Sequence, residues 1–82
     1  MNFEISWHPT AAKNIDNLPR NISERILKKF DEVAANPFRY LEHFEGDGYK
    51  LRIGDFRALI DVDFHNKILK VRVFDKRGRV YE

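Results

Sequence analysis

Basic side chains gather in two stretches of the C-terminal half of the chain. The first stretch, "YKLRIGDFRALIDVD", contains Lys50, Arg52 and Arg57. The second, "DKRGRVYE", adds three cations and an aromatic ring: Lys76, Arg77, Arg79 and Tyr81. Guanidinium and ammonium groups bind phosphate, and an aromatic ring stacks on a base. Together these side chains are typical of a site for single-stranded nucleic acid.

The spacing in the first stretch predicts that two of the cations face each other. Gly54-Asp55 reads as a two-residue hairpin turn of type II′ character, which pairs Arg52 with Arg57. Like charges about 5 Å apart repel by roughly 1 kcal/mol in water. Lys50 adds to this repulsion from a diagonal position. We therefore predict that an anion, absent from the isolated chain, relieves the repulsion when it binds.

A structural reading of the same residues stays open. Long basic side chains on a solvated sheet face can splay apart and keep their charges in water. Tyr81 can equally be a core residue at the end of the chain. Phe74 falls on the predicted basic face, where it would be a second stacking platform.

The elements that must position these residues can be read from the alternation of apolar side chains. The N-terminal half predicts a strand with Phe3, Ile5 and Trp7 inward, a helix over 10–18, and a longer helix over about 21–35 with Asn21 as its N-cap. Residues 37–48 read as a loop. Strands follow over 49–53, 56–63 and 67–74, with a turn at His65-Asn66, and a last short strand covers 79–81.

The two hairpin turns place one set of apolar side chains on a single sheet face, which the helices should cover. That set is Leu51, Ile53, Phe56, Ala58, Ile60, Val62, Leu69, Val71 and Val73. The opposite face then carries Lys50, Arg52, Arg57, Leu59, Asp61, Lys70, Arg72 and Phe74, with Asp61 opposite Lys70 as an ion pair. The predicted fold class is α+β: an N-terminal strand, two helices, then an antiparallel meander with the helices on one face.

Composition limits the class of protein. The 82 residues suit a single domain, 1–82, and carry a net charge of +2. From residue 50 onward the chain has nine Lys or Arg against five Asp or Glu, so the basic excess lies in the C-terminal half. The absence of cysteine excludes thiol nucleophiles and thiolate metal sites. The three histidines lack metal-ligand spacing, and no signal peptide or membrane span is evident, which favours a cytoplasmic protein.

At this point the chain resembles a known family, the RelE/ParE toxin superfamily of prokaryotic toxin–antitoxin systems. The similarity rests on the order of elements, on the basic hairpin with the pair Phe56-Arg57, and on an Arg four residues before a terminal Tyr in "KRGRVY". It covers nearly the whole chain. Two departures are visible: many relatives have Lys where this chain has Arg52, and many continue past the terminal Tyr into a short helix.

The resemblance implies an mRNA interferase of the RelE type, which cuts mRNA in the ribosomal A site by attack of the RNA 2′-hydroxyl on the adjacent phosphate, without metal or cofactor. It implies a basic pair at Lys50 and Arg52, a phosphate contact at Arg57, leaving-group protonation or charge stabilisation at Arg77, and stacking at Tyr81. Clustered cations make Lys50 the predicted general base. Further RNA contacts are predicted at Arg72, Phe74, Lys76 and Arg79.

The resemblance also implies partners: a RelB-like acidic antitoxin, the ribosome and its mRNA, and no membrane. Two other functions remain open from the sequence. ParE-type members of the superfamily poison DNA gyrase, and generally lack the catalytic basic and Tyr set. A non-enzymatic RNA-binding module would use the same basic face without cleavage.

Overall fold

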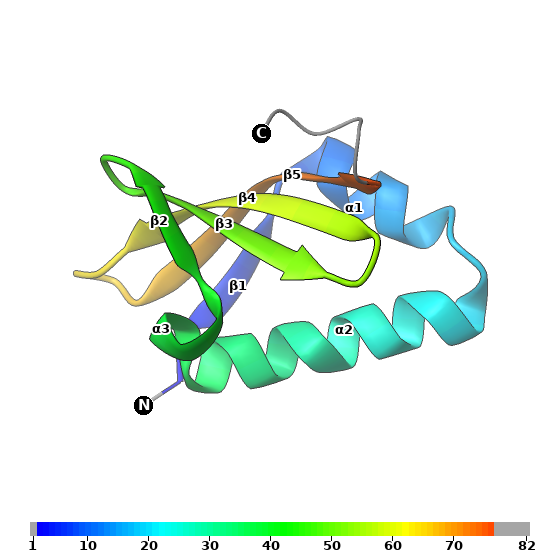
Figure 1. The fold of residues 1–82 in the computed structure, drawn as a ribbon, viewed down its shortest axis with the longest axis horizontal. Helices are drawn as coiled ribbons and strands as arrows, with labels where there is room; N and C mark the ends of the chain where they lie inside the picture. The colour runs from blue at the N-terminus through cyan, green and yellow to red at the C-terminus, as the bar shows by residue number, and fades with distance from the viewer. Residues whose placement is uncertain (1, 77–82) are drawn as a thin grey trace.

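In the part of the chain that the structure describes, one mixed sheet of five strands forms the centre (Figure 1). The computed structural model describes residues 2–76. The elements in chain order are β1 (Glu4–Trp7), α1 (Pro9–Asp16), α2 (Arg20–Ala35), α3 (Pro37–Tyr40), β2 (Glu42–Glu45), β3 (Gly48–Ile53), β4 (Phe56–Asp63) and β5 (Ile68–Lys76). The strand order is β1-β5-β4-β3-β2, with β1 parallel to β5 and the other neighbours antiparallel. The predicted α+β class and the C-terminal meander are confirmed.

Proline residues set the starts of the three helices found within residues 2–76. Pro9 occupies the first turn of α1, and the N–H of Thr10 donates to His8 Nδ1 at 3.2 Å. The expected N-cap of α2 at Asn21 is wrong, because α2 already begins at Arg20 with Pro19 in the cap position and no side-chain cap. Proline fixes φ near the helical value and lacks the N–H that a first turn leaves unpaired. A helix can therefore start at this point without a polar cap.

The segment 37–48 is not the loop that the sequence suggests. It contains the single-turn helix α3 and the edge strand β2, which pairs with β3 through Glu42–Lys50 and His43–Tyr49. β2 has only four residues, and Phe44 is the only one of them that is partly buried. A four-residue edge strand with one partly buried side chain shows no alternation of apolar and polar residues, so the sequence does not reveal it.

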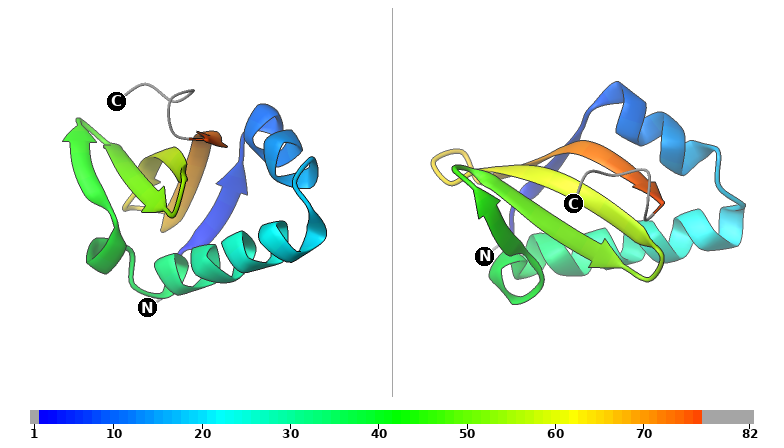
Figure 2. Two further views of the ribbon diagram at one scale, coloured as in Figure 1. Left: turned by 45° about the vertical axis from the view of Figure 1, so that its right-hand side comes forward. Right: turned by 45° about the horizontal axis from the view of Figure 1, so that its top comes forward.

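Both long helices pack on the same face of the sheet (Figure 2). The buried core combines Ala11 and Ile15 of α1, Ile26, Phe30, Val33 and Ala34 of α2, and Leu51, Ala58, Ile60, Val62, Leu69, Val71 and Phe74 of the sheet. Trp7 contacts the edge of the Phe30 ring at a centroid distance of 4.7 Å. The predicted placement of the helices over one apolar sheet face is confirmed.

A β-bulge in β5 changes the register that the sequence predicts. The pairs Val62–Leu69 and Ile60–Val71 are present as expected, but the register then shifts, so that Ala58 faces Phe74 and not Val73. Phe74 is 1% exposed and stacks on Phe56 at a centroid distance of 5.3 Å. A bulge inserts one residue and reverses the alternation beyond it. It buries the larger aromatic ring in the core in place of Val73.

This shift corrects one predicted site residue. Phe74 was expected on the basic face as a stacking platform and RNA contact, and that expectation is wrong because its ring lies in the core. The connection between β4 and β5 also differs from a two-residue turn: it spans residues 64–67, and Lys67 has a φ of +57°. The predicted strand over 79–81 lies outside the described residues.

Candidate nucleic-acid interface

The β3–β4 hairpin brings two cations face to face, as predicted. Arg52 and Arg57 are Cα partners in the sheet, and the turn that joins their strands contains Gly54 at a φ of +55°. A positive φ is the conformation that the first position of a type II′ turn requires, and glycine adopts it without a steric penalty. The local sequence therefore determines this pairing.

Arg57 is held more tightly than a solvent-facing arginine. Its side chain is 8% exposed, and Nη1 donates to the carbonyl oxygens of Phe56 at 3.2 Å and Gly54 at 3.4 Å. On the other side of β4, its Cα partner is Asp75 of β5. The row across three strands is thus Arg52, Arg57, Asp75. A carboxylate on the neighbouring strand reduces the electrostatic cost of the two arginines.

Lys50 lies beside a carboxylate that the sequence analysis placed in a loop. Its Nζ is 3.7 Å from Glu42 Oε1 and 5.4 Å from the centroid of the Phe44 ring. Both neighbours come from β2. Opposite charges at directly paired positions of two antiparallel strands would have identified Glu42, had β2 been recognised as a strand.

The three hairpin cations line one small pocket of about 220 Å³. Its lining is completed by Tyr40, Glu42 and Leu51. Tyr40 was not considered from the sequence, although its ring lies 4.4 Å from Lys29 Nζ and 5.9 Å from Arg39 Cζ. A pocket with two partly or fully exposed cations and a buried arginine can bind a phosphate, provided that the phosphate displaces or tolerates Glu42.

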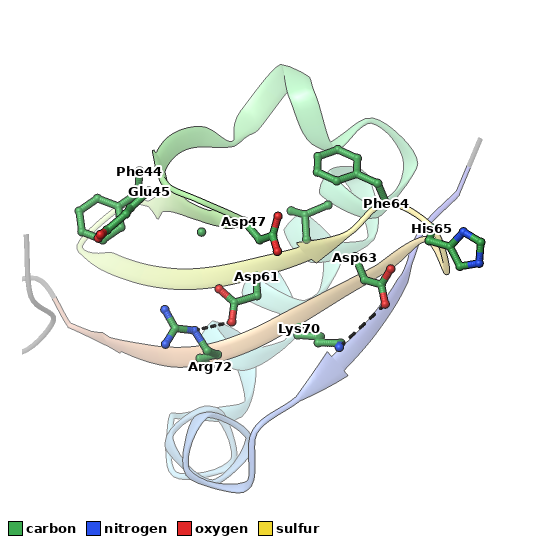
Figure 3. Close-up of a pocket in the computed structure, with 11 residues that line it drawn as sticks. Phe44, Glu45, Asp47, Asp61, Asp63, Phe64, His65, Lys70 and Arg72 are labelled. Carbon is green, nitrogen blue, oxygen red and sulfur yellow. Dashed lines mark ion pairs between the residues drawn. The ribbon is translucent and has the colours of Figure 1, made fainter.

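Arg72 lies in a different pocket, of about 620 Å³, on the outer side of β4 and β5 (Figure 3). Its Nε is 2.9 Å from Asp61 Oδ2, while Lys70 Nζ is 3.9 Å from Asp63 Oδ2. The predicted Asp61–Lys70 ion pair is therefore wrong, although the two residues are Cα partners. The long side chains reach diagonally along the sheet to the neighbouring carboxylates.

Four predicted site residues remain, and the structure describes one of them. Lys76 is exposed and lines a further cavity with Ile22, Asp55 and Phe56, next to the β3–β4 turn. Arg77, Arg79 and Tyr81 lie outside the described residues. The structure thus brings together Lys50, Arg52 and Arg57, separates Arg72 from them, and buries Phe74.

A hydrogen-bonded turn at the other end of β4 lowers the pKa of an aspartate carboxyl. Asp63 accepts hydrogen bonds from the backbone N–H and from the side-chain amide of Asn66, each at 3.0 Å. These two bonds, the first above all, lower the pKa of the Asp63 carboxyl from its ordinary value of 3.8, with a smaller contribution from Lys70. The carboxylate of Asp63 therefore stabilises the loop that leads into β5.

The family of the chain follows from its sequence match. The family model described as "ParE toxin of type II toxin-antitoxin system, parDE" matches residues 5–81. The chain belongs to this toxin family. The resemblance to the RelE/ParE superfamily, inferred above from the basic hairpin and the order of elements, is thereby confirmed. No curated protein matches the chain.

Solved structures of RelE toxins share the fold. The RelBE2 toxin–antitoxin complex of Mycobacterium tuberculosis matches with a TM-score of 0.82 and 18% identity, over 94% of this chain and 100% of that chain. The RelE–RelB complex of Pyrococcus horikoshii matches with a TM-score of 0.77 and 25% identity, over 98% of this chain and 100% of that chain. Isolated Escherichia coli RelE matches with a TM-score of 0.76 and 21% identity, over 95% of this chain and 87% of that chain. The protein is a toxin of a type II toxin–antitoxin system. Among the described residues, no helix is long and apolar enough to span a bilayer.

Proposed function

We propose that this toxin is a ribosome-dependent endoribonuclease that cuts mRNA in the A site without a metal or cofactor. The observation that supports this proposal is the pocket in which Lys50, Arg52 and Arg57 converge from two neighbouring strands. In-line attack on a phosphodiester passes through a pentavalent phosphorane with additional negative charge. Cations that are already positioned stabilise that charge more than they stabilise the ground state.

The proposed reaction is a transesterification. The RNA 2′-oxygen attacks the adjacent phosphorus and loses its proton to a general base, for which Lys50 is the candidate. The bond from phosphorus to the 5′-oxygen breaks, and that oxygen takes a proton from water, leaving a 2′,3′-cyclic phosphate and a 5′-hydroxyl. Arg52 and Arg57 would bind the phosphate oxygens, with Arg57 held in place by its two carbonyl contacts. Arg77 would stabilise the leaving group and Tyr81 would stack on the cut nucleotide.

We further propose that an antitoxin of the RelB kind binds this protein, because several of the similar structures are RelE–RelB complexes. Arg72, Lys76 and Arg79 are proposed as additional RNA contacts. For Arg72 this requires its ion pair with Asp61 to open, or to remain while the outer guanidinium nitrogens bind phosphate.

The test is cleavage of mRNA on programmed ribosomes, mapped by primer extension. Wild-type protein should cut within the A-site codon, and only when ribosomes are present. Arg52→Ala and Arg77→Ala should each lower the cleavage rate by about a hundredfold or more, while Lys13→Ala on α1 serves as the matched control. If the folded protein binds RNA but does not cut it, the endoribonuclease proposal is wrong and the protein is an RNA-binding module.

Inhibition of DNA gyrase is the second candidate function. The observation that favours it is the family match, because the matching model is named for ParE. The carboxylate of Glu42 inside the pocket also makes that pocket less favourable for a polyanion than the sequence suggested. A supercoiling assay with purified gyrase distinguishes the two functions. Inhibition of supercoiling together with no ribosomal cleavage would establish the second function and reject the first.

A further inference from the structure

One carboxylate lies among the three cations of the hairpin pocket, and the proposed reaction does not use it. Glu42 lines the pocket of about 220 Å³ together with Lys50, Arg52 and Arg57. Its side chain is 78% exposed, and its Oε1 lies 3.7 Å from Lys50 Nζ. Within residues 2–76, the Glu42 carboxylate makes no hydrogen bond with another side chain or with the backbone. An exposed ion pair of this kind adds little to stability. Glu42 is therefore available to accept hydrogen bonds from a ligand.

The order of the strands sets the distance between this carboxylate and the proposed phosphate contacts. Glu42 on β2 is the Cα partner of Lys50 on β3, and Arg57 lies on β4, on the other side of β3. Neighbouring strands are about 4.8 Å apart, so the β2 and β4 backbones are separated by about 10 Å. One nucleotide spans a similar length from its phosphate to the far edge of its base. A phosphate at Arg52 and Arg57 thus leaves the base of the same nucleotide within reach of Glu42.

An aromatic ring borders the same side of the pocket. Tyr40 precedes Glu42 by two residues, lines the pocket and packs against the hydrophobic core. Lys29 Nζ of α2 lies 4.4 Å from the centroid of the Tyr40 ring, and this cation–π contact helps to hold the ring in place. Every nucleobase has a π face that packs against an aromatic ring. Tyr40 therefore offers affinity for a base without selecting among the four bases.

A carboxylate, in contrast, discriminates between bases. When ionised it only accepts hydrogen bonds, through two oxygens that lie side by side. Proteins read the unpaired bases of single-stranded RNA on their Watson–Crick edge. On that edge guanine presents two adjacent donors, N1–H and the N2 amino group. Adenine and cytosine each present one amino group beside a ring nitrogen that accepts, and uracil presents one N–H between two carbonyl groups. Guanine alone therefore matches both oxygens of Glu42.

We infer that Glu42 and Tyr40 form a base subsite that selects guanine in the nucleotide whose phosphate is bound at Arg52 and Arg57. The Tyr40 ring packs against the base, and the two oxygens of Glu42 accept from N1–H and from the N2 amino group. The inference rests on the RNA site of the proposed function and adds the identity of one base to it. Because three cations outnumber the single carboxylate, the pocket as a whole still attracts RNA.

The experiment compares the dissociation constants of RNA pentamers that differ only in the central base, measured by fluorescence anisotropy. The central base is guanine, adenine, uracil or hypoxanthine in a strand that otherwise contains uridine, and 2′-O-methyl groups prevent cleavage. Hypoxanthine keeps N1–H but lacks the N2 amino group. The wild-type protein should bind the guanine pentamer about tenfold or more tightly than the adenine and uracil pentamers. The hypoxanthine pentamer should bind with intermediate affinity, because it retains one of the two donors.

Substitutions at Glu42 and Tyr40 separate selectivity from affinity. Glu42→Gln should lower the preference for guanine to less than about threefold, because an amide group replaces one acceptor oxygen by a donor. It should also raise affinity for the adenine and uracil pentamers, since a negative charge is removed. Glu45→Gln removes the same charge from the same strand outside the pocket and should leave the preference unchanged. Tyr40→Leu should weaken binding of all four pentamers by a similar factor, and Tyr40→Phe should behave as wild type.

Circular dichroism confirms that each variant is folded before binding is measured. Equal affinity of the wild-type protein for all pentamers, or no binding of any of them, would overturn the inference. A guanine preference that persists in Glu42→Gln would overturn it as well. Cleavage on ribosomes that is independent of guanine would reject the subsite and leave the endoribonuclease proposal standing. Conversely, a guanine preference that Glu42→Gln abolishes, in a protein that cuts no mRNA on ribosomes, would support the subsite and reject the enzyme.

Discussion

Arg57 and Asp75 are Cα partners across β4 and β5, on the side of β4 opposite to Arg52. Within the β3–β4 hairpin alone, the two arginines repel each other. In the three-strand row an arginine stands between another arginine and a carboxylate, and two backbone carbonyls also accept from it. Asp75 and the two carbonyl groups therefore offset part of the repulsion between the two arginines. No bound anion is needed to explain why the hairpin folds.

Arg57→Ala should destabilise the domain. The variant loses two hydrogen bonds from a side chain that is 8% exposed. We expect the free energy of unfolding in urea to fall by about 1–3 kcal/mol. Arg57→Lys keeps the charge without the planar donor geometry and should recover part of the loss. A more stable Arg57→Ala protein would mean that repulsion from Arg52 outweighs these contacts.

Glu42→Gln should strengthen RNA binding. The change removes the carboxylate 3.7 Å from Lys50 Nζ and leaves the shape of the pocket nearly the same. Because the Glu42 side chain is exposed and Lys50 only partly buried, stability should change by less than about 1 kcal/mol. Affinity for a short single-stranded RNA, measured by fluorescence anisotropy, should rise severalfold, with a steeper salt dependence. Glu45→Gln, one residue beyond Phe44 on the same strand, is the control. Equal effects of both changes would show that only net charge matters.

Phe74→Ala should be strongly destabilising. The ring is 1% exposed and stacks on Phe56, so its removal leaves a cavity that the core cannot close completely. We expect a loss of about 3–5 kcal/mol in the free energy of unfolding, and a smaller loss for Phe74→Leu. Denaturant unfolding followed by tryptophan fluorescence would measure both. A stable Phe74→Ala protein with weakened RNA binding would show that Phe74 contacts RNA at the surface, as expected from the sequence.

Asp63 should make stability depend on acid pH. Its pKa is lower in the folded protein than the ordinary 3.8, so its contribution to stability is fully present above 3.8 and is lost as the pH falls through the folded pKa. The difference in unfolding free energy between wild type and Asp63→Asn should therefore be present at neutral pH and shrink below pH 3.8. Asp47→Asn is the control, since it lacks this contact with Asn66. A difference that stays constant with pH would contradict the assignment.

The basic hairpin could be predicted from local sequence alone. Gly54 supplies the positive φ of the turn, and the alternation of Leu51, Ile53, Phe56 and Ala58 admits only one register that buries them all. A two-residue turn and period-two alternation are short-range constraints, so no distant part of the chain is needed to apply them. The helical spacing of apolar side chains and the proline residues are also local signals, and they place the two main helices within a few residues of their observed ends.

The surroundings of the hairpin were decided by tertiary structure. The bulge in β5 turns Phe74 and not Val73 into the helix-covered core, and which of the two side chains fills that space depends on the packed core and not on the alternation within the strand. β2 exists because β3 offers it an edge, and only through that pairing does Glu42 reach Lys50. The sequence by itself determined which cations face each other on the hairpin. Packing between distant segments determined which carboxylates and rings accompany them, because those contacts form only when the whole sheet is assembled.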